Sequence, residues 1–284
     1  MNIVHDVTTL RDCVAAAKAR NLRVGFVPTM GALHEGHVSL VRRAREESGF
    51  GVVSIFVNPL QFAPGEDFAR YPRRLDEDSK FLAQAGADLL YAPDPESFYS
   101  PDFSTSVDVA GVTDGGEGAA RPGHFRGVAT VVARLFLQVA PDAAYFGRKD
   151  LQQVAVIRRM ARDLDFPVAI IVLPTVREPD GLAMSSRNAY LSPADRLLAA
   201  ALPRALFAAR DRAAAGATDA RALEDETGRE LERAGLAVDY VEAVDPETMA
   251  RAARVRPGIA LAAAVRLGKT RLIDNVPLDP AAER

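Results

Sequence analysis

Residues 22–59 read LRVGFVPTMGALHEGHVSLVRRAREESGFGVVSIFVNP, and the fold class can be inferred from this stretch. The first apolar run, Leu22–Val27, stops at a proline and a glycine-containing turn. A helix is expected from about Gly36 to Ser48, and a second β-rich run, Phe50–Val57, stops at an Asn-Pro pair. Strand, helix and strand in this order predict two parallel strands joined by a helix that packs on the sheet.

The alternation continues through the first two-thirds of the chain. Further strands are expected at 88–91, 143–146 and 168–173, and helices at 128–139 and 150–164. Together these segments predict an α/β fold with a Rossmann-like, mostly parallel sheet covered by helices on both faces. Ligands bind beyond the carboxyl ends of such strands, so the turns at 28–37 and 58–62 are expected to form the site.

The sequence pattern changes after Pro174. Ser192 followed by Pro193 is typical of a helix start, with serine as the N-cap and proline at the first helical position. The remaining elements are an alanine-rich helix to about residue 214, a helix to about 234, and strands near 238–243, 259–266 and 271–273. We therefore expect a first domain over residues 1–174 and a second, smaller α/β domain over 175–284.

The composition excludes several classes of protein. The net charge of -3 gives no global basic field for nucleic acid or an anionic membrane. Cys13 is the only cysteine, so the chain has no internal disulfide and no thiolate metal cluster. No secretory signal and no apolar run long enough to span a membrane is seen, which predicts a cytoplasmic protein.

The strongest local signal is the turn that contains His34 and His37. Glycines at 31 and 36 allow a backbone to approach a phosphate closely, and the following helix would present its N–H groups and positive dipole end to an anion. The two histidines are three residues apart, so they project from one face of a helical turn. Two imidazoles beside a phosphate are able to stabilise charge as it develops.

Two further segments contain groups that suit polyphosphate. Lysine is scarce in this chain, with only four residues against many arginines, which draws attention to Lys149 at a predicted helix start. Met184–Arg187 offers two hydroxyls and a guanidinium. Taken alone, this second segment is equally well explained as a turn before the Ser192 helix cap.

Several motifs together resemble one family. The H-x-G-H turn resembles the signature of the nucleotidyltransferase superfamily shared with class I aminoacyl-tRNA synthetases. Four more segments resemble the pantothenate synthetase (pantoate–β-alanine ligase) family in order and spacing, and the resemblance runs from near the N-terminus to Asn275, almost the whole chain. These are FVNPLQF at 56–62, RPGHFRGV at 121–128, FGRKDLQQ at 146–153 and RLIDN at 271–275.

The resemblance implies a role for each matching position. His34 and His37 resemble the pair that contacts ATP phosphates, with His37 as the proton donor, and Lys149 is implied to be catalytic with them. Gln61 and Gln153 resemble the pair that holds the pantoate hydroxyls, and Gln61 also borders the β-alanine position. The implied ATP contacts are Met30, Gly31, Ala32, Leu33, His34, Glu35, Gly36, His37, Gly147, Arg148, Lys149, Asp150, Val176, Met184, Ser185, Ser186 and Arg187.

Some assignments stay open from the sequence. Asp76 and Asp78 are either neighbours of Mg²⁺ or part of a solvated acidic helix face, and the second interpretation is favoured. Arg121 and Arg126 either clamp an anion or pair on the surface. Arg148 departs from the family pattern, because relatives often carry an acidic or amide residue there.

The implied reaction is the ATP-dependent joining of pantoate to β-alanine through a pantoyl adenylate, with ATP as co-substrate and Mg²⁺ present. The resemblance also implies a homodimer and a second domain that closes over the ATP site, with no nucleic-acid or membrane partner. One rival is an adenylyltransferase that releases a dinucleotide, which leaves the two glutamines unexplained. A second rival is a regulatory nucleotide-binding module, which would not need the reactive positions that are all present.

Overall fold

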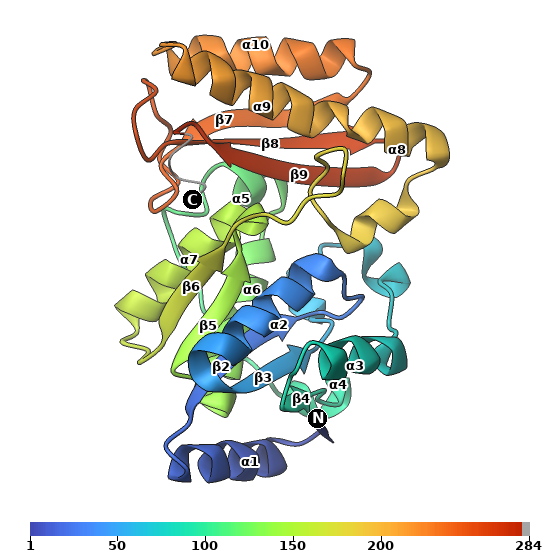
Figure 1. Ribbon diagram of the computed structural model, residues 1–284, viewed down its shortest axis with the longest axis vertical. Coiled ribbons are helices and arrows are strands. Elements are labelled where there is room, and N and C mark those ends of the chain that lie inside the picture. Colours follow the sequence, from blue (N-terminus) through green and yellow to red (C-terminus); the bar gives the residue numbers. More distant parts are fainter. Residues whose placement is uncertain (280–284) are drawn as a thin grey trace. The chain divides into compact units, whose positions relative to one another are not determined.

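The structure is a computed structural model that describes residues 1–279, and its chain divides into two compact units (Figure 1). Unit 1 consists of residues 1–109, 121–147 and 156–173. Unit 2 consists of residues 110–120, 148–155 and, within the described chain, 174–279. Each unit has its own sheet and is described by itself.

Unit 1 contains a six-stranded parallel sheet in the order β1-β4-β3-β2-β5-β6, as the alternating pattern predicts. The strands are β1 (Asn2–Val4), β2 (Arg23–Thr29), β3 (Gly49–Ile55), β4 (Leu89–Tyr91), β5 (Ala143–Gly147) and β6 (Ala169–Leu173). Its helices are α1 (Val7–Ala19), α2 (Glu35–Ser48), α3 (Leu75–Gln84), α4 (Pro95–Phe98), α6 (His124–Val139) and the second part of α7 (Leu151–Asp163), with short 3-10 turns η1 (Pro59–Gln61) and η2 (Asp67–Arg70).

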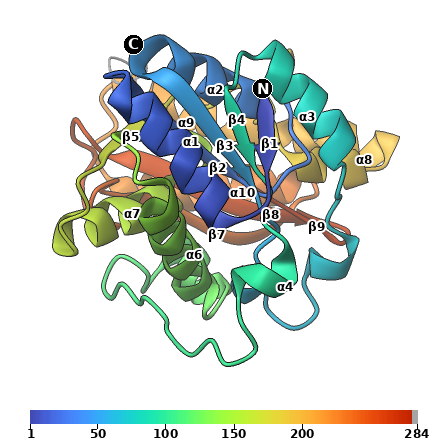
Figure 2. The same cartoon turned by 90° about the horizontal axis from the view of Figure 1, so that it is seen from below.

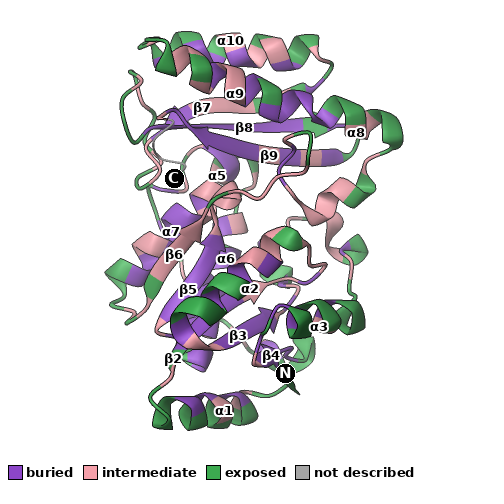
Figure 3. Cartoon of the chain, in the orientation of Figure 1, coloured by how far each residue is buried: buried purple, intermediate pink, exposed green. Residues whose placement is uncertain are grey.

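Successive residues of a strand point to opposite faces of the sheet. In unit 1 the residues on both faces are apolar, so helices cover both faces. Val27 of β2 belongs to a buried cluster with Val41 of α2, a helix that packs on β2, β3 and β5. Phe26, the preceding residue, meets Phe136 of α6 edge to face at 6.4 Å between ring centroids. Figure 2 shows α6 and α1, and Figure 3 shows the buried residues concentrated in the strands.

Unit 2 contains a three-stranded antiparallel sheet in the order β7-β8-β9, with α9 and α10 packed on one face (Figure 1). The strands are β7 (Ala237–Val244), β8 (Ala260–Leu267) and β9 (Thr270–Pro277). The other elements are α5 (Gly116–Ala120), η3 (Arg148–Asp150), the first part of α7, η4 (Ser186–Tyr190), α8 (Pro193–Ala199), α9 (Ala201–Ala214) and α10 (Ala220–Arg233). Its core joins Leu202 and Leu206 of α9 to Leu261 and Val265 of β8.

Two details of unit 2 differ from the sequence predictions. The single alanine-rich helix expected up to residue 214 is two helices that meet at Ala200, because Pro203 has no N–H to donate to the carbonyl of Ala199. Strand β9 is longer than the predicted 271–273, because polar residues such as Asp274 and Asn275 are buried within it. The cap at Ser192 is as expected, since its hydroxyl accepts the N–H of Asp195 at 3.1 Å.

Segments 110–120 and 148–155 belong to unit 2, although one boundary after residue 174 was expected. The buried Gln152 explains the grouping of the two segments, because its amide donates to the carbonyls of Val112 and Gly115 at 2.9 Å each and accepts the N–H of Glu117 at 2.8 Å. Glu117 in turn pairs with Arg271 of β9 and accepts from the Tyr240 hydroxyl of β7. Side-chain bonds thus tie both segments to the smaller sheet.

Candidate active site

The turn after β2 is shaped by two positive backbone angles. Gly31 has φ +82° and Ala32 has φ 52°. A side chain on residue 31 would lie 3.0 Å from Asp78 and 3.1 Å from Ile55, so the turn requires glycine there. The turn delivers the chain to the N-terminus of α2, whose positive dipole end favours an anion, and the side chains of His34 and His37 cap this end.

Asp78 braces this turn, and the favoured interpretation of a solvated acidic face is wrong for this residue. It is 3% exposed, and its two carboxylate oxygens accept the N–H groups of Ala32 at 2.9 Å and Leu33 at 2.8 Å. Asp76, two residues earlier on α3, is exposed as that interpretation expects. Residues two apart on a helix lie on nearly opposite sides of it, so Asp76 faces solvent while Asp78 faces the turn.

His34 and His37 begin α2, and their rings lie 4.2 Å apart between centroids. Nδ1 of His34 accepts the N–H of Gly36 at 3.2 Å, and Nδ1 of His37 accepts the N–H of His34 at 3.4 Å. A nitrogen that accepts has no proton, so each neutral ring carries its proton on Nε2. The capping arrangement therefore selects a tautomer whose outer nitrogen is a donor.

Gln61 ends η1 and lies beside the same turn, since its Nε2 is 3.0 Å from Sδ of Met30. Its Oε1 accepts from Asn58, which is 1% exposed and also donates to the carbonyl of Gly127. A side chain at Gly127 would overlap the carbonyl of Leu60, so η1 and α6 pack backbone to backbone. Asn58 lies in the FVNPLQF motif at 56–62, but the sequence alone does not indicate its role.

The open question about Arg121 and Arg126 is answered by their partners. Arg121 donates to both carboxylate oxygens of Glu66, at 2.8 and 2.7 Å, and to the carbonyl of Gln61 at 3.3 Å. Arg126 donates to the exposed Asp108 at 3.0 Å, so it pairs on the surface. Burial raises the pKa of Glu66, but the bonds from Arg121 outweigh it and hold the pKa of this carboxyl below its usual range.

His124 completes this arrangement around Gln61. Its Nδ1 lies 2.8 Å from the carbonyl of Gln61, and its Nε2 lies 3.0 Å from the Arg121 guanidinium. The carbonyl can only accept and the guanidinium can only donate, so the ring is neutral with its proton on Nδ1. Arg121, held by Glu66, and His124 thus fix the backbone of Gln61, and the RPGH segment was the sequence signal for Arg121 and His124.

Apart from Gly147, which belongs to unit 1, the remaining predicted contacts lie in unit 2. Lys149 lies in η3, which follows Gly147 at the end of β5, and its Nζ is 3.6 Å from a carboxylate oxygen of Asp150. Gln153 is half-buried on α7, whereas the neighbouring Gln152 has the structural role described above. The Lys149 ammonium group therefore lies in the short turn that precedes α7, at the helix start predicted from the sequence.

Residues 176–187 form a folded-back segment in unit 2. The N–H of Met184 donates to the carbonyl of Val176 at 3.0 Å, and Arg177 forms a β-bridge with Ala183. Ser185 caps η4 by accepting the N–H of Arg187 at 3.3 Å. The segment is thus an ordered hairpin whose far strand holds the predicted phosphate contacts.

Arg177 connects this hairpin to β9. Its guanidinium donates twice to Asp274, at 2.6 and 3.0 Å, and also to the carbonyls of Gly181 and Asn275. Burial raises the pKa of Asp274, whose side chain has no exposed surface, while the paired bonds from Arg177 oppose that rise. The guanidinium also lies 4.9 Å from the ring centroid of Phe207.

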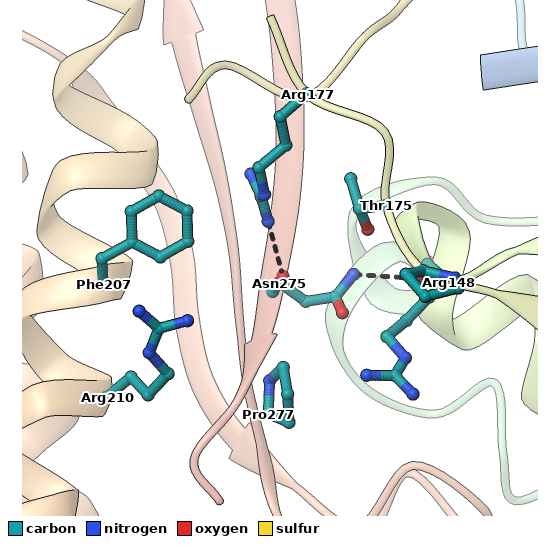
Figure 4. Close-up of a pocket in the computed structure, with 8 residues that line it drawn as sticks. Arg148, Thr175, Arg177, Phe207, Arg210, Asn275 and Pro277 are labelled. Carbon is teal, nitrogen blue, oxygen red and sulfur yellow. Dashed lines mark hydrogen bonds between the residues drawn. The ribbon is translucent and has the colours of Figure 1, made fainter. Parts of the chain in front are cut away.

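A cavity of about 220 Å³ lies beside this ion pair (Figure 4). Its lining residues are Arg148, Pro174, Thr175, Arg177, Phe207, Arg210, Asn275 and Pro277. Arg148 is the only predicted ATP contact among them. In Figure 4 the side chain of Asn275 points toward Arg148, and the guanidinium of Arg177 points toward the backbone of Asn275.

Neither a metal cage nor a membrane span is found in the part of the chain that the structure describes. Residues 1–279 contain no group of three or more His, Cys, Asp or Glu placed to hold a metal ion. Asp78, one of the two candidate ligands, already accepts two N–H groups. Within the same residues, every helix is too short or too polar to cross a membrane.

The comparisons with known proteins identify the family. The sequence profile of the family described as pantoate–β-alanine ligase matches residues 2–277. The chain belongs to this family. Among curated relatives, the pantothenate synthetase of Moorella thermoacetica is 50% identical over 283 residues, covering 98% of this chain and 99% of the relative.

Solved structures of the pantoate–β-alanine ligase family agree with this chain over its whole length. The pantothenate synthetase of Thermus thermophilus has a TM-score of 0.93 and 50% identity, covering 99% of this chain and 100% of that one. The pantoate–β-alanine ligase of Francisella tularensis, a complex with β,γ-ATP and β-alanine, has a TM-score of 0.82 and 32% identity, with 98% of each chain covered. The expected family and fold class are confirmed.

Proposed function

We propose that this chain is the ligase that joins pantoate to β-alanine with ATP, and that the reaction passes through pantoyl adenylate. The family match over residues 2–277 carries the choice of substrates. The ligase activity and its dependence on ATP are those of relatives that share half of the sequence. The adenylate follows from chemistry, because a carboxylate must be activated before an amine is able to displace an oxygen from it.

The first step needs charge stabilisation more than proton transfer. A carboxylic acid with a pKa of about 4 is ionised at neutral pH, so pantoate needs no general base to attack the α-phosphorus of ATP. His34 and His37 support this step, because their Nε2–H donors stand at the N-terminus of α2. Lys149 adds a compact positive charge from η3.

Pantoate recognition is proposed for Gln61 and Gln153. An amide both donates and accepts, which suits two hydroxyls on one small substrate. Gln61 supports the proposal best, since Asn58 fixes its side chain and His124 and Arg121 fix its carbonyl. A fixed glutamine loses little conformational entropy when the substrate binds.

ATP contacts are proposed in both units, with unit 2 closing over the nucleotide during turnover. Residues 30–37 would cradle the phosphates from unit 1, and 147–150, Val176 and 184–187 would complete the site. The ordered hairpin of residues 176–187 supports this assignment, because it presents Ser185, Ser186 and Arg187 in succession. Exclusion of water would protect a hydrolysable adenylate.

Three further features belong to the proposal. Mg²⁺ is expected to enter with the ATP phosphates as part of the substrate, because Mg²⁺ usually binds through substrate phosphates and water with only one or two carboxylates. A homodimer and a cytoplasmic location are expected from the family and from the single cysteine.

The decisive experiment measures AMP and pyrophosphate release from Mg-ATP with both substrates, each alone, and neither. AMP release that requires pantoate and β-alanine together supports the ligase. Pyrophosphate release that β-alanine never affects would point to an adenylyltransferase with another acceptor. ATP binding without turnover would favour a regulatory module and overturn the proposal.

A further inference from the structure

Strand β9 carries two adjacent buried polar residues, Asp274 and Asn275. They are 2% and 3% exposed, and they pair across the sheet with Ala263 and Ala262 of β8. Successive residues of a strand point to opposite faces, so one strand offers a polar group to each side of the smaller sheet. Neither residue belongs to the predicted nucleotide contacts.

Asn275 holds the backbone that presents Lys149. Its Nδ2 donates to the carbonyl of Arg148 at 3.0 Å and to the carbonyl of Lys149 at 2.9 Å, and the first of these bonds is drawn in Figure 4. Two bonds from one amide to successive carbonyls fix the orientation of that peptide. The direction in which the Lys149 side chain leaves the chain is fixed with it.

The donor capacity of the Asn275 amide matches these two carbonyls, because an NH2 group has two N–H donors. The two donated bonds explain why the position carries an amide.

Asp274 acts on the second predicted contact segment. It accepts two bonds from Arg177, and Arg177 also donates to the carbonyl of Gly181 inside the turn of the 176–187 hairpin. The N–H of Asn275 is bonded to the same carboxylate at 2.8 Å, which links the two residues directly. The hairpin and η3 are therefore anchored to neighbouring positions of one strand.

We propose that Asn275 and Asp274 are positioning residues for the nucleotide-contacting part of unit 2, Asn275 through the backbone of Lys149 and Asp274 through Arg177 and the hairpin. This inference rests on the proposed function, which assigns Lys149 and Met184–Arg187 to ATP. Because both anchors lie on one strand, a shift of η3 and a shift of the hairpin are coupled.

The test compares Asn275→Leu with Thr270→Val, a change at another buried polar residue of β9. Pyrophosphate release in a single turnover with ATP and pantoate is measured, with the KM of each substrate and the melting temperature. Asn275→Leu should lower kcat/KM for ATP about 30-fold, because a small misplacement of a charged group has a large effect on rate. The KM for pantoate should stay within about twofold in both variants, and Thr270→Val should retain the ATP kinetics.

A double-mutant cycle with Lys149→Ala separates positioning from general destabilisation. If Asn275 acts through Lys149, adding Asn275→Leu to Lys149→Ala should lower adenylate formation by no more than about twofold. A fully additive loss, or equal losses for ATP and pantoate, would overturn the proposal. Should Asn275→Leu fail to fold, Asn275→Ser, which keeps one hydroxyl donor, should show an intermediate loss confined to ATP; full ATP kinetics in it would also overturn the proposal.

The same cycle distinguishes this inference from the proposed function. Normal adenylate formation in Lys149→Ala alone would remove the role of Lys149, whatever Asn275→Leu shows. An impaired Lys149→Ala beside an unimpaired Asn275→Leu would refute only the positioning role.

Discussion

The two units build their parts of the candidate site in different ways. In unit 1 the proposed phosphate contacts lie within eight consecutive residues, 30–37, between the end of β2 and the start of α2. In unit 2 they come from separate segments, 148–150 and 176–187, which a buried strand holds by side-chain bonds. A contiguous site is shaped by local backbone geometry, whereas a dispersed site depends on residues that never touch a ligand.

The largest expected effect concerns Lys149, one of the proposed contacts in unit 2. Lys149→Ala should lower the rate of adenylate formation about 10²–10³-fold, because it removes a positive charge from the developing phosphate charge. Lys269→Ala is the matched control, since Lys269 is exposed in the turn between β8 and β9. Equal rates in the two variants, measured by rapid-quench pyrophosphate release, would remove Lys149 from the chemistry.

The next effect tests whether the turn of residues 30–37 in unit 1 depends on Asp78, which lies outside it in the sequence. Asp78→Asn should destabilise the protein by about 1–3 kcal/mol and raise the KM for ATP, because an amide cannot accept both N–H groups with its single oxygen. Denaturant unfolding and steady-state kinetics measure the two consequences. Asp76→Asn changes an exposed residue of the same helix and should alter neither the free energy of unfolding nor the KM for ATP. If Asp78→Asn behaved like Asp76→Asn, the bracing role of Asp78 would be disproved.

A smaller effect concerns the pantoate side of unit 1. Arg121→Met should raise the KM for pantoate about tenfold, because Gln61 loses a charged hydrogen bond to its carbonyl and His124 loses its partner. Arg126→Met removes only an exposed pair and should leave the KM unchanged. A larger change for ATP than for pantoate would mean that Arg121 serves a different ligand.

The smallest effect is a pH dependence of stability. Glu66 has a lowered pKa in the folded protein, so its pair with Arg121 contributes fully above the unfolded value of about 4.3 and is lost as the pH falls through the folded value. Glu66→Gln should therefore destabilise the protein by no more than about 1 kcal/mol at pH 7, since the pair is partly exposed. The difference should shrink below about pH 4 in urea titrations, and a difference that grows there would contradict the assignment.

Sequence reasoning was most successful where function and local structure share the same residues. The positions of β2, α2 and β3 follow from apolar periodicity, a proline and two glycines, and the family follows from motifs spread along the chain. The single domain boundary after residue 174 is the weakest of these expectations, because side-chain bonds from Gln152 group two short segments with unit 2. Such bonds join residues that are far apart in the chain, and the sequence contains no periodic pattern that would predict them.

The sequence by itself determined the alternating sheet, the H-x-G-H turn at a helix N-terminus and the family, since each is written in consecutive residues or fixed spacings. Only the tertiary structure decided that Asp78 braces the turn, that Arg121 and His124 hold Gln61, and that β9 anchors η3. The physical reason is that a buried carboxylate is satisfied by whichever N–H groups the fold brings within 3 Å, as Asp78 shows with Leu33, 45 residues away in the chain.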